Sequence, residues 1–170
     1  MSAERLFFAL WPPADVRAAL VTERAALPAR PGRLSHALDL HLTLVFIGAV
    51  DDASRPCIES AAEDVIADPF ELRLDAVGDW PRSRIWFARP TETPPMLFNL
   101  VSQLEHHCLV CGLQQERRPY RPHVTLARKA PPLVPRAIDI SWPVADFVLA
   151  AGKAGRTPSY QIMRSWPLGV

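Results

Sequence analysis

Two short segments of the chain repeat one another in a way that suits acid–base chemistry. Segment 41–44 reads His-Leu-Thr-Leu, and segment 123–126, which starts 82 residues later (123 minus 41), reads His-Val-Thr-Leu. The chain has only five histidines and six threonines among 170 residues, so composition alone rarely produces two such matches. The separation is close to half the chain. It indicates an internal duplication with two similar lobes facing each other.

The spacing within each segment places an imidazole beside a hydroxyl, because side chains two residues apart on a strand point to the same face. If both strands line one cleft, His41 and His123 can form the acid–base pair of an in-line displacement at phosphorus. One imidazolium protonates the departing oxygen while a neutral imidazole accepts a proton from the attacking water. A histidine pKa near 6.5 lets both forms exist near neutrality. The hydroxyls of Thr43 and Thr125 can bind the non-bridging phosphate oxygens.

These histidines allow two other interpretations. A single histidine on a strand is usually a half-buried structural residue, but two in matching contexts favour catalysis. Histidine also binds metals, yet Asp39 is the only acid or cysteine near either motif. We therefore expect no metal site and no cofactor.

The composition is that of an ordinary globular domain, with 49% hydrophobic and 22% charged residues. A net charge of +1 excludes a globally basic protein that coats DNA. Three cysteines, an odd number without a secretory signal, favour a reducing compartment. The first 13 residues hold only six consecutive apolar residues before two prolines, too few for a signal-peptide core or a membrane span. These features predict a cytoplasmic monomer without membrane association.

Hydrophobic patterns predict seven strands and three helices. The strands are expected over residues 5–11, 41–47, 70–77, 84–89, 123–127, 146–151 and 160–166. The helices are expected over residues 15–27, from a cap at Ser54 to about residue 67, and from about residue 93 to Gly112. This mixed order predicts an α+β fold with largely antiparallel sheets. No flexible linker divides the chain, so residues 1–170 should form one domain.

The repeated motif resembles that of the two-histidine (2H) phosphoesterase superfamily, which is defined by paired His-x-Thr-x motifs. More narrowly, the chain is similar to the bacterial RNA 2′,3′-cyclic phosphodiesterases, also called 2′-5′ RNA ligases. The similarity covers most of the sequence, namely segments 5–10, 41–48, 80–86, 118–128 and 160–168. Family members often carry a Glu-Ser pair after the second motif, where this chain has Leu-Ala-Ala-Gly at 149–152.

The resemblance implies a bilobal, pseudo-symmetric fold, with two mainly antiparallel sheets lining a central cleft and helices outside. It implies that an RNA 2′,3′-cyclic phosphate is opened to a 2′-phosphomonoester without a metal, the 3′ oxygen leaving. His41 would be the proton donor and His123 the acceptor. The expected partners are RNA ends or nucleotides with a 2′,3′-cyclic phosphate. Some family members also join RNA ends through a 2′-5′ linkage, which is the reverse chemistry.

Several cations accompany the second motif. No acid occurs between Glu116 and Asp139, whereas six cations do, which indicates a local anion site or a solvated basic loop. Arg128 is the best candidate for a bidentate phosphate clamp. Strand parity puts it on the face opposite His123, so a clamp requires a strand end or a local bend there. Arg118 and Arg121 could guide an RNA backbone or could be solvated loop residues.

Four aromatic residues could each stack a nucleobase, although such residues more often belong to the core, namely Phe46, Trp80, Trp86 and Tyr160.

Three alternative functions stay open. The chain could be mainly a ligase, or could act on small nucleotides such as ADP-ribose 1″,2″-cyclic phosphate. It could also be a non-catalytic RNA-end binder, which the intact histidine repeat disfavours. A further possibility is a thiol or zinc protein, which would use Cys108 and Cys111 with two neighbouring histidines, His106 and His107. These residues form only one half-site within an expected helix. We therefore interpret that helix as structural.

Overall fold

The computed structural model describes residues 4–28 and 32–169 and confirms the α+β class. In this part of the chain the helices are α1 (Ala14–Ala25), α2 (Arg55–Glu63) and α3 (Pro95–Cys108), with 3-10 turns η1 (Ala37–Asp39) and η2 (Leu109–Cys111). The strands are β1 (Glu4–Leu10), β2 (Arg33–Leu34), β3 (Leu42–Val50), β4 (Phe70–Trp80), β5 (Ile85–Arg89), β6 (Val124–Arg128), β7 (Arg136–Val144), β8 (Asp146–Gly152) and β9 (Tyr160–Pro167). No helix within the described ranges is long and apolar enough to cross a membrane.

The strands form one antiparallel sheet rather than the two separate sheets expected. Its order is β7-β4-β5-β6-β3-β1-β8-β9, with β2 added to β6. A single residue pair, Leu42 opposite Val124, joins the two halves between β3 and β6. The two halves of the sheet therefore meet at the residues that directly follow the two motif histidines.

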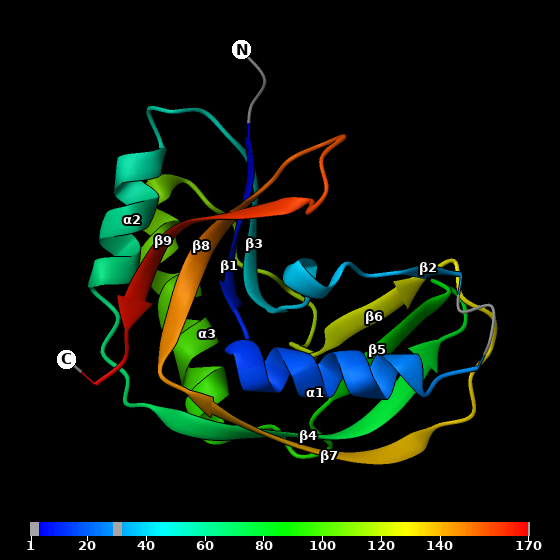
Figure 1. Cartoon of the computed structure of the whole chain (residues 1–170). Coiled ribbons are helices and arrows are strands. Elements are labelled where there is room, and N and C mark those ends of the chain that lie inside the picture. The colour runs from blue at the N-terminus through cyan, green and yellow to red at the C-terminus, as the bar shows by residue number, and fades with distance from the viewer. Residues whose placement is uncertain (1–3, 29–31, 170) are drawn as a thin grey trace.

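Helices cover the two halves differently. Figure 1 shows α2 and α3 side by side against the β3-β1-β8-β9 half, whereas α1 lies along the half that contains β7. Strand β1 is buried on both faces, since Leu6 and Phe8 face the main core while Phe7 and Ala9 pack with Val148 in a second, small cluster. Burial on both faces explains the unbroken apolar run at the start of the chain.

Strand β7 was missed by the sequence analysis. Its side chains alternate between buried and exposed, with Ile138, Ile140, Trp142 and Val144 on the core side. Pro143 cannot donate a ladder hydrogen bond, and it is tolerated because β7 is an edge strand. The alternating pattern is present in the sequence, and a proline within it weakens the indication of a strand.

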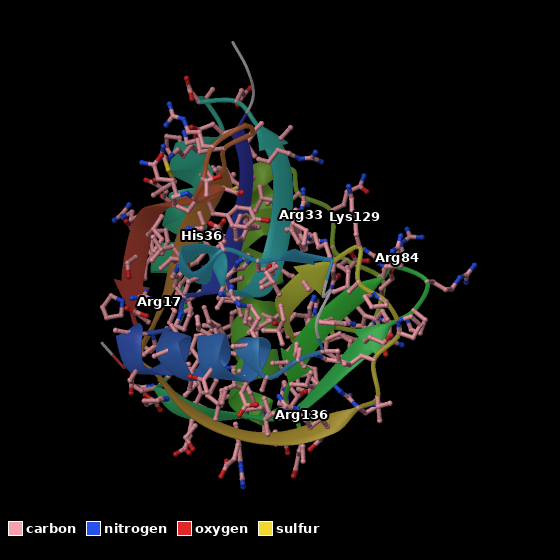
Figure 2. The ribbon with its side chains drawn as sticks, turned by 45° about the vertical axis from the view of Figure 1, so that its right-hand side comes forward. Arg17, Arg33, His36, Arg84, Lys129 and Arg136 are labelled. Atoms are coloured by element: carbon pink, nitrogen blue, oxygen red, sulfur yellow. A yellow bond between two sulfur atoms is a disulfide. The ribbon has the colours of Figure 1, made fainter. Side chains whose placement is uncertain are left out.

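The sheet is larger than predicted at two places, the end of β3 and the segment that contains β2. Strand β3 continues beyond Gly48 to Val50, because Gly48 has φ +89° and the register against β1 shifts next to it. Strand β2 lies where the sequence analysis predicted neither a strand nor a helix, and in it Arg33 pairs with Arg128 of β6. Arg33 and Lys129 consequently lie at the same edge of the molecule (Figure 2).

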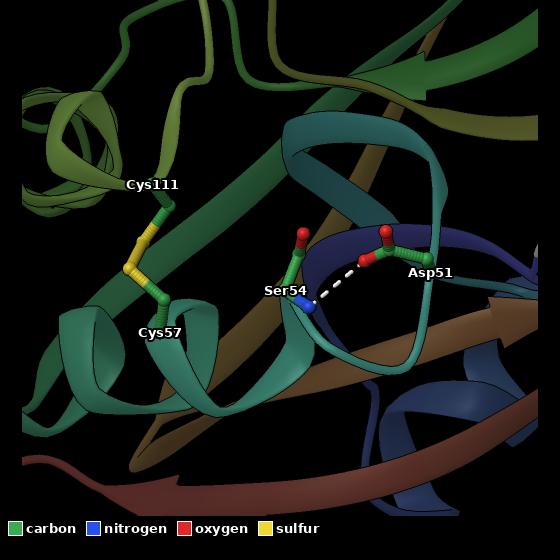
Figure 3. Close-up of a disulfide and its surroundings, with 4 residues drawn as sticks. All are labelled: Asp51, Ser54, Cys57 and Cys111. Atoms are coloured by element: carbon green, nitrogen blue, oxygen red, sulfur yellow. Dashed lines mark hydrogen bonds between the residues drawn. A yellow bond between two sulfur atoms is a disulfide. The ribbon is translucent and has the colours of Figure 1, made fainter.

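A disulfide between Cys57 and Cys111 joins α2 to the turn after α3 (Figure 3). The sequence analysis did not predict this bond, and the expectation of a reducing compartment, drawn from the odd cysteine count, stays a prediction. Cys108 is buried and free, and burial raises the pKa of its thiol to about 11. The start of α2 also differs, since the side chain of Ser54 makes no cap bond and its backbone N–H donates to Asp51 Oδ1 at 2.9 Å.

Loss of this disulfide should destabilise the fold. Cys57 and Cys111 are 54 residues apart, and closing a loop of that length stabilises a protein by about 2–4 kcal/mol. We expect a reductant to lower the free energy of unfolding by this amount, seen as a lower urea midpoint. Cys57→Ser should have the same effect. The variant is its own control, because adding reductant to it should change nothing further. An unchanged midpoint for the reduced wild-type protein would contradict the prediction.

Candidate active site

The first motif begins just before β3, where backbone and hydroxyl groups fix the His41 ring. Its Nδ1 donates to the carbonyl oxygen of Asp39 at 2.6 Å. A carbonyl can only accept, so Nδ1 carries the proton and Nε2 of the neutral ring is an acceptor. The Thr43 hydroxyl lies 3.1 Å from Nε2 and donates to it. Nε2 is therefore the nitrogen available for proton transfer.

The second motif repeats this arrangement at the start of β6. His123 Nδ1 donates to the carbonyl oxygen of Arg121 at 2.8 Å, so the acceptor is again the residue two positions earlier. The same tautomer follows, with Nε2 free. Two strands from different halves of the chain thus present their histidines in one local geometry. This supports a functional role for the repeat, since a purely structural histidine has no need of it.

The strand register brings the two motifs together. Leu42 and Val124 are partners across β3 and β6, and both side chains are buried in the core. In an antiparallel pair of strands this register sets His41 opposite Thr125 and Thr43 opposite His123. All four side chains lie on the face away from the core. The two imidazoles and two hydroxyls therefore form one group.

Aromatic rings enclose His41 and explain its pKa. Trp11 stacks on the imidazole with ring centroids 4.8 Å apart and planes 8° from parallel. Tyr160 approaches it edge-on at 5.0 Å, and Phe7 is tilted against it at 5.0 Å. Desolvation lowers the pKa of His41 to about 4; the hydrogen bond and charge of Asp39 oppose this shift, whereas His123 and Arg128 add to it. His41 is neutral at pH 7 in the free protein.

His123 has a similar but more open environment. Trp80 packs edge-on against it with centroids 4.5 Å apart, and Phe87 lies 6.1 Å away. Burial lowers the pKa of His123, partly offset by its hydrogen bond to Arg121 and reinforced by the charge of Arg128.

A β-bulge returns Arg128 to the cleft face. Trp86 pairs with Ala127 but Phe87 pairs with Thr125, so β6 carries one extra residue opposite β5. The extra residue shifts the alternation of β6 by one, so Arg128 lies on the same face as Thr125. The bulge is thus the local bend that a clamp role for Arg128 requires. Its charge lowers the pKa of both His41 and His123, which places the guanidinium within electrostatic range of both imidazoles. The position suits a phosphate clamp.

The other predicted aromatic residues divide into three groups. Tyr160 and Trp80 are in the site, each against one histidine. Phe46 lies on β3 with 78% of its surface exposed, and its ring is 6.2 Å from that of Phe7. Trp86 is fully buried and donates to the carbonyl oxygen of Pro131 at 2.7 Å, so it is a core residue and cannot stack a base.

The two other predicted arginines differ in their contacts. Arg118 forms an exposed ion pair with Glu116 at 3.1 Å, so its charge is already partnered. Arg121 is exposed and contributes its carbonyl oxygen to the orientation of His123. A role for either side chain in guiding RNA stays a prediction.

Sequence reasoning missed three residues that build the site, namely Trp11, Asp39 and Tyr120. Asp39 is the one buried charged residue of the described ranges, and its carboxylate accepts from the backbone N–H groups of Ser159 at 2.8 Å and Tyr160 at 3.1 Å. Asp39 thereby holds the tyrosine that covers His41. Tyr120 donates to the carbonyl oxygen of Thr43 at 2.8 Å and ties the approach to the second motif to the first. An acid two residues before the motif was the available signal for Asp39.

No three or more histidine, cysteine, aspartate or glutamate side chains in residues 4–28 and 32–169 are grouped so that they could hold a metal ion. Two imidazoles with unprotonated Nε2 atoms, two hydroxyls and one guanidinium converge instead. This set can bind a phosphate and move protons to and from its ester oxygens.

The chain is similar to known phosphoesterases over most of its length. The 2′-5′ RNA ligase superfamily matches residues 12–150. A protein of Escherichia coli (strain K12) named RNA 2′,3′-cyclic phosphodiesterase is 34% identical over 171 residues, covering 97% of each chain. The protein of that name from Thermus thermophilus is 29% identical, covering 96% of this chain and 90% of its own. The crystal structure of E. coli LigT complexed with 3′-AMP superposes with a TM-score of 0.88 at 32% identity over 99% of both chains.

Proposed function

The chain belongs to the 2′-5′ RNA ligase superfamily, and on that basis we propose that it hydrolyses RNA 2′,3′-cyclic phosphodiester ends to 2′-phosphomonoesters. The observation that carries the proposal is the matched pair of histidines. Each donates Nδ1–H to the carbonyl two residues earlier and has an unprotonated Nε2, on one face shared with two threonines and Arg128. The named activity of the E. coli and T. thermophilus relatives supports the choice of substrate.

The reaction follows from this geometry. The cyclic phosphate binds with its non-bridging oxygens to the hydroxyls of Thr43 and Thr125 and to Arg128. Water attacks phosphorus opposite the 3′ oxygen and gives a proton to Nε2 of His123. The P–O3′ bond breaks, and the departing oxygen takes a proton from Nε2 of His41, leaving a 2′-phosphate and a 3′-hydroxyl. The similarity to the family assigns the donor role to His41.

The substrate itself must help to charge the donor. His41 is desolvated and neutral at pH 7 in the free protein, since its pKa is about 4. An anionic phosphate beside the ring favours the imidazolium and raises this pKa in the complex. The buried, aromatic surroundings therefore make protonation of His41 dependent on bound substrate.

We expect kcat/KM to be highest on the acidic side of neutrality. Catalysis needs one protonated and one neutral imidazole, and in the free protein the pKa values of both lie below 6.5. Raising the pH above both values removes the single proton, so kcat/KM falls about tenfold per pH unit. Because bound phosphate raises both pKa values, the profile of kcat should lie at higher pH. Initial rates over a pH series test this, and a falling limb of kcat/KM centred above pH 7 would contradict it.

The proposed function is tested by incubating the protein with a short RNA that carries a 2′,3′-cyclic phosphate. The expected product is a 2′-phosphomonoester, identified by mass spectrometry and by its resistance to a 3′-specific phosphatase. EDTA should leave the rate unchanged. A 3′-phosphate product would contradict the assigned leaving group. Binding without any product would sink the proposal in favour of an RNA-end binder.

A further inference from the structure

Backbone contacts bring three cations from distant parts of the chain to one edge of the sheet. The N–H of Ala130 donates to the carbonyl oxygen of Arg84 at 3.0 Å, and the Arg84 guanidinium donates to that of Lys129 at 3.2 Å. Arg33 reaches the same place because β2 pairs with β6 at Arg128. Figure 2 shows Arg33, Lys129 and Arg84 gathered on one flank of the molecule. We call Arg33, Arg84 and Lys129 the basic flank.

The backbone of this flank is unusual. Arg84 has φ 56° and Lys129 has φ 53°, and they are the two non-glycine residues with positive φ in the described ranges. L-residues rarely adopt this conformation, which glycine or asparagine accommodates better. Both positions nevertheless carry long cationic side chains. Local strain of this kind is often found at functional sites, where the neighbouring structure holds it in place.

The charges of the flank are free and continuous with the cleft. Arg33, Arg84 and Lys129 are exposed, and none forms an ion pair with an acid within residues 4–28 and 32–169. Arg128, the strand partner of Arg33 and the neighbour of Lys129, acts electrostatically on both histidines. The flank therefore adjoins the arginine that faces the two motif histidines.

The other side of the site is less suitable for a polyanion. A hollow of about 820 Å³ opens beside Tyr160, but its wall mixes the acids Glu4 and Asp52 with cations. Lys153 in that wall is already paired with Glu4 at 2.8 Å. In the hollow a phosphate chain would meet the carboxylates of Glu4 and Asp52 beside the cations, whereas Arg128 and the basic flank present cations without an acid among them.

We propose that the basic flank binds the phosphates of an RNA strand upstream of its reacting end, so that the protein prefers oligonucleotide ends over mononucleotides. This inference rests on the proposed function, because it specifies the substrate class of the same site. Each phosphate contact on a single strand releases about 0.7 of a counterion. Three such contacts steepen the dependence of binding on salt by about 2 units of slope on a log–log plot.

The test compares two triple variants that lose the same charge. The first is Arg33→Gln, Arg84→Gln, Lys129→Gln. The second, its matched control, changes Arg17, Arg73 and Arg136 to Gln on α1, β4 and β7, and Figure 2 shows Arg17 and Arg136 away from the flank. Fluorescence anisotropy measures binding of a single-stranded RNA oligomer ending in a 2′-phosphate over a salt series. A second measurement gives kcat/KM for an RNA oligomer and for a mononucleoside 2′,3′-cyclic phosphate.

The flank variant should bind the oligomer at least about tenfold more weakly at low salt, with a slope lower by about 2, while the control stays close to wild type. Its kcat/KM should fall much more for the oligomer than for the mononucleotide. Three outcomes would each overturn the inference: the two triple variants lose the same binding affinity, the flank variant loses the same kcat/KM on both substrates, or its oligomer binding is unchanged. If the wild-type protein cleaves neither substrate, the proposed function fails, and the binding data still decide the role of the flank.

Discussion

Alanine at either His41 or His123 should lower kcat by about 10²–10⁴-fold, since each substitution removes one proton transfer. The double variant should be little worse than the poorer single variant, because the two residues act as a unit. Neither imidazole belongs to the main core, so both variants should fold. His106→Ala, on an exposed position of α3, is the matched control and should retain full activity. Retained hydrolysis in both single variants would remove the histidines from the mechanism.

The same variants can separate the two roles. A phosphodiester with a nitrophenolate leaving group needs no proton at the departing oxygen. The variant that lacks the donor should therefore recover much of its activity on such a substrate, whereas the variant that lacks the acceptor should not. We expect recovery in His41→Ala. Recovery in His123→Ala instead would reverse the assignment without affecting the proposed reaction.

Substitution of Arg128 by alanine should lower kcat/KM by about 10²–10³-fold. Enzymes typically lose that much activity when a preorganised group that stabilises transition-state charge is removed. Arg128→Lys should restore only part of this, because an ammonium cannot hold two phosphate oxygens in a planar fork. Arg128 also lowers the pKa of both histidines. Its removal should accordingly move the kcat/KM profile to higher pH.

A surface arginine provides the control for Arg128. Arg89 is exposed at the end of β5, and Arg89→Ala removes the same charge from the neighbouring strand. Steady-state kinetics of the three variants decide the matter. Equal effects of Arg89→Ala and Arg128→Ala would mean that overall charge matters and that Arg128 is not a clamp.

The sequence could predict the site where local periodicity determines geometry. The alternation of a strand puts each histidine beside its threonine, and the structure has His41 and Thr43 in hydrogen-bond contact. The half-chain repeat predicted that the two motifs face each other, and the strands that carry them pair at Leu42 and Val124. These features depend on residues close together in sequence or on a motif that recurs.

What escaped prediction depends on contacts between distant residues. The local bend that a clamp at Arg128 requires could not be located from the sequence, because the bulge on β6 exists only opposite β5. Strand β7 was missed because Pro143 is harmless only at a sheet edge, which sequence alone does not reveal. The Cys57–Cys111 disulfide spans 54 residues, and cysteine spacing gave no sign of it. The stacking of Trp11 on His41 likewise needs the whole sheet.

The contact between Asp39 and the start of β9 has a consequence for how the protein is made. Residues 159 and 160 bind the Asp39 carboxylate 120 and 121 residues later in the chain, and Tyr160 then covers His41. A chain is synthesised from its N-terminus, so both histidines are made before this cover. The environment that desolvates His41 is therefore completed only when β9 docks. Until then, an unfinished polypeptide carries both motifs without their final surroundings.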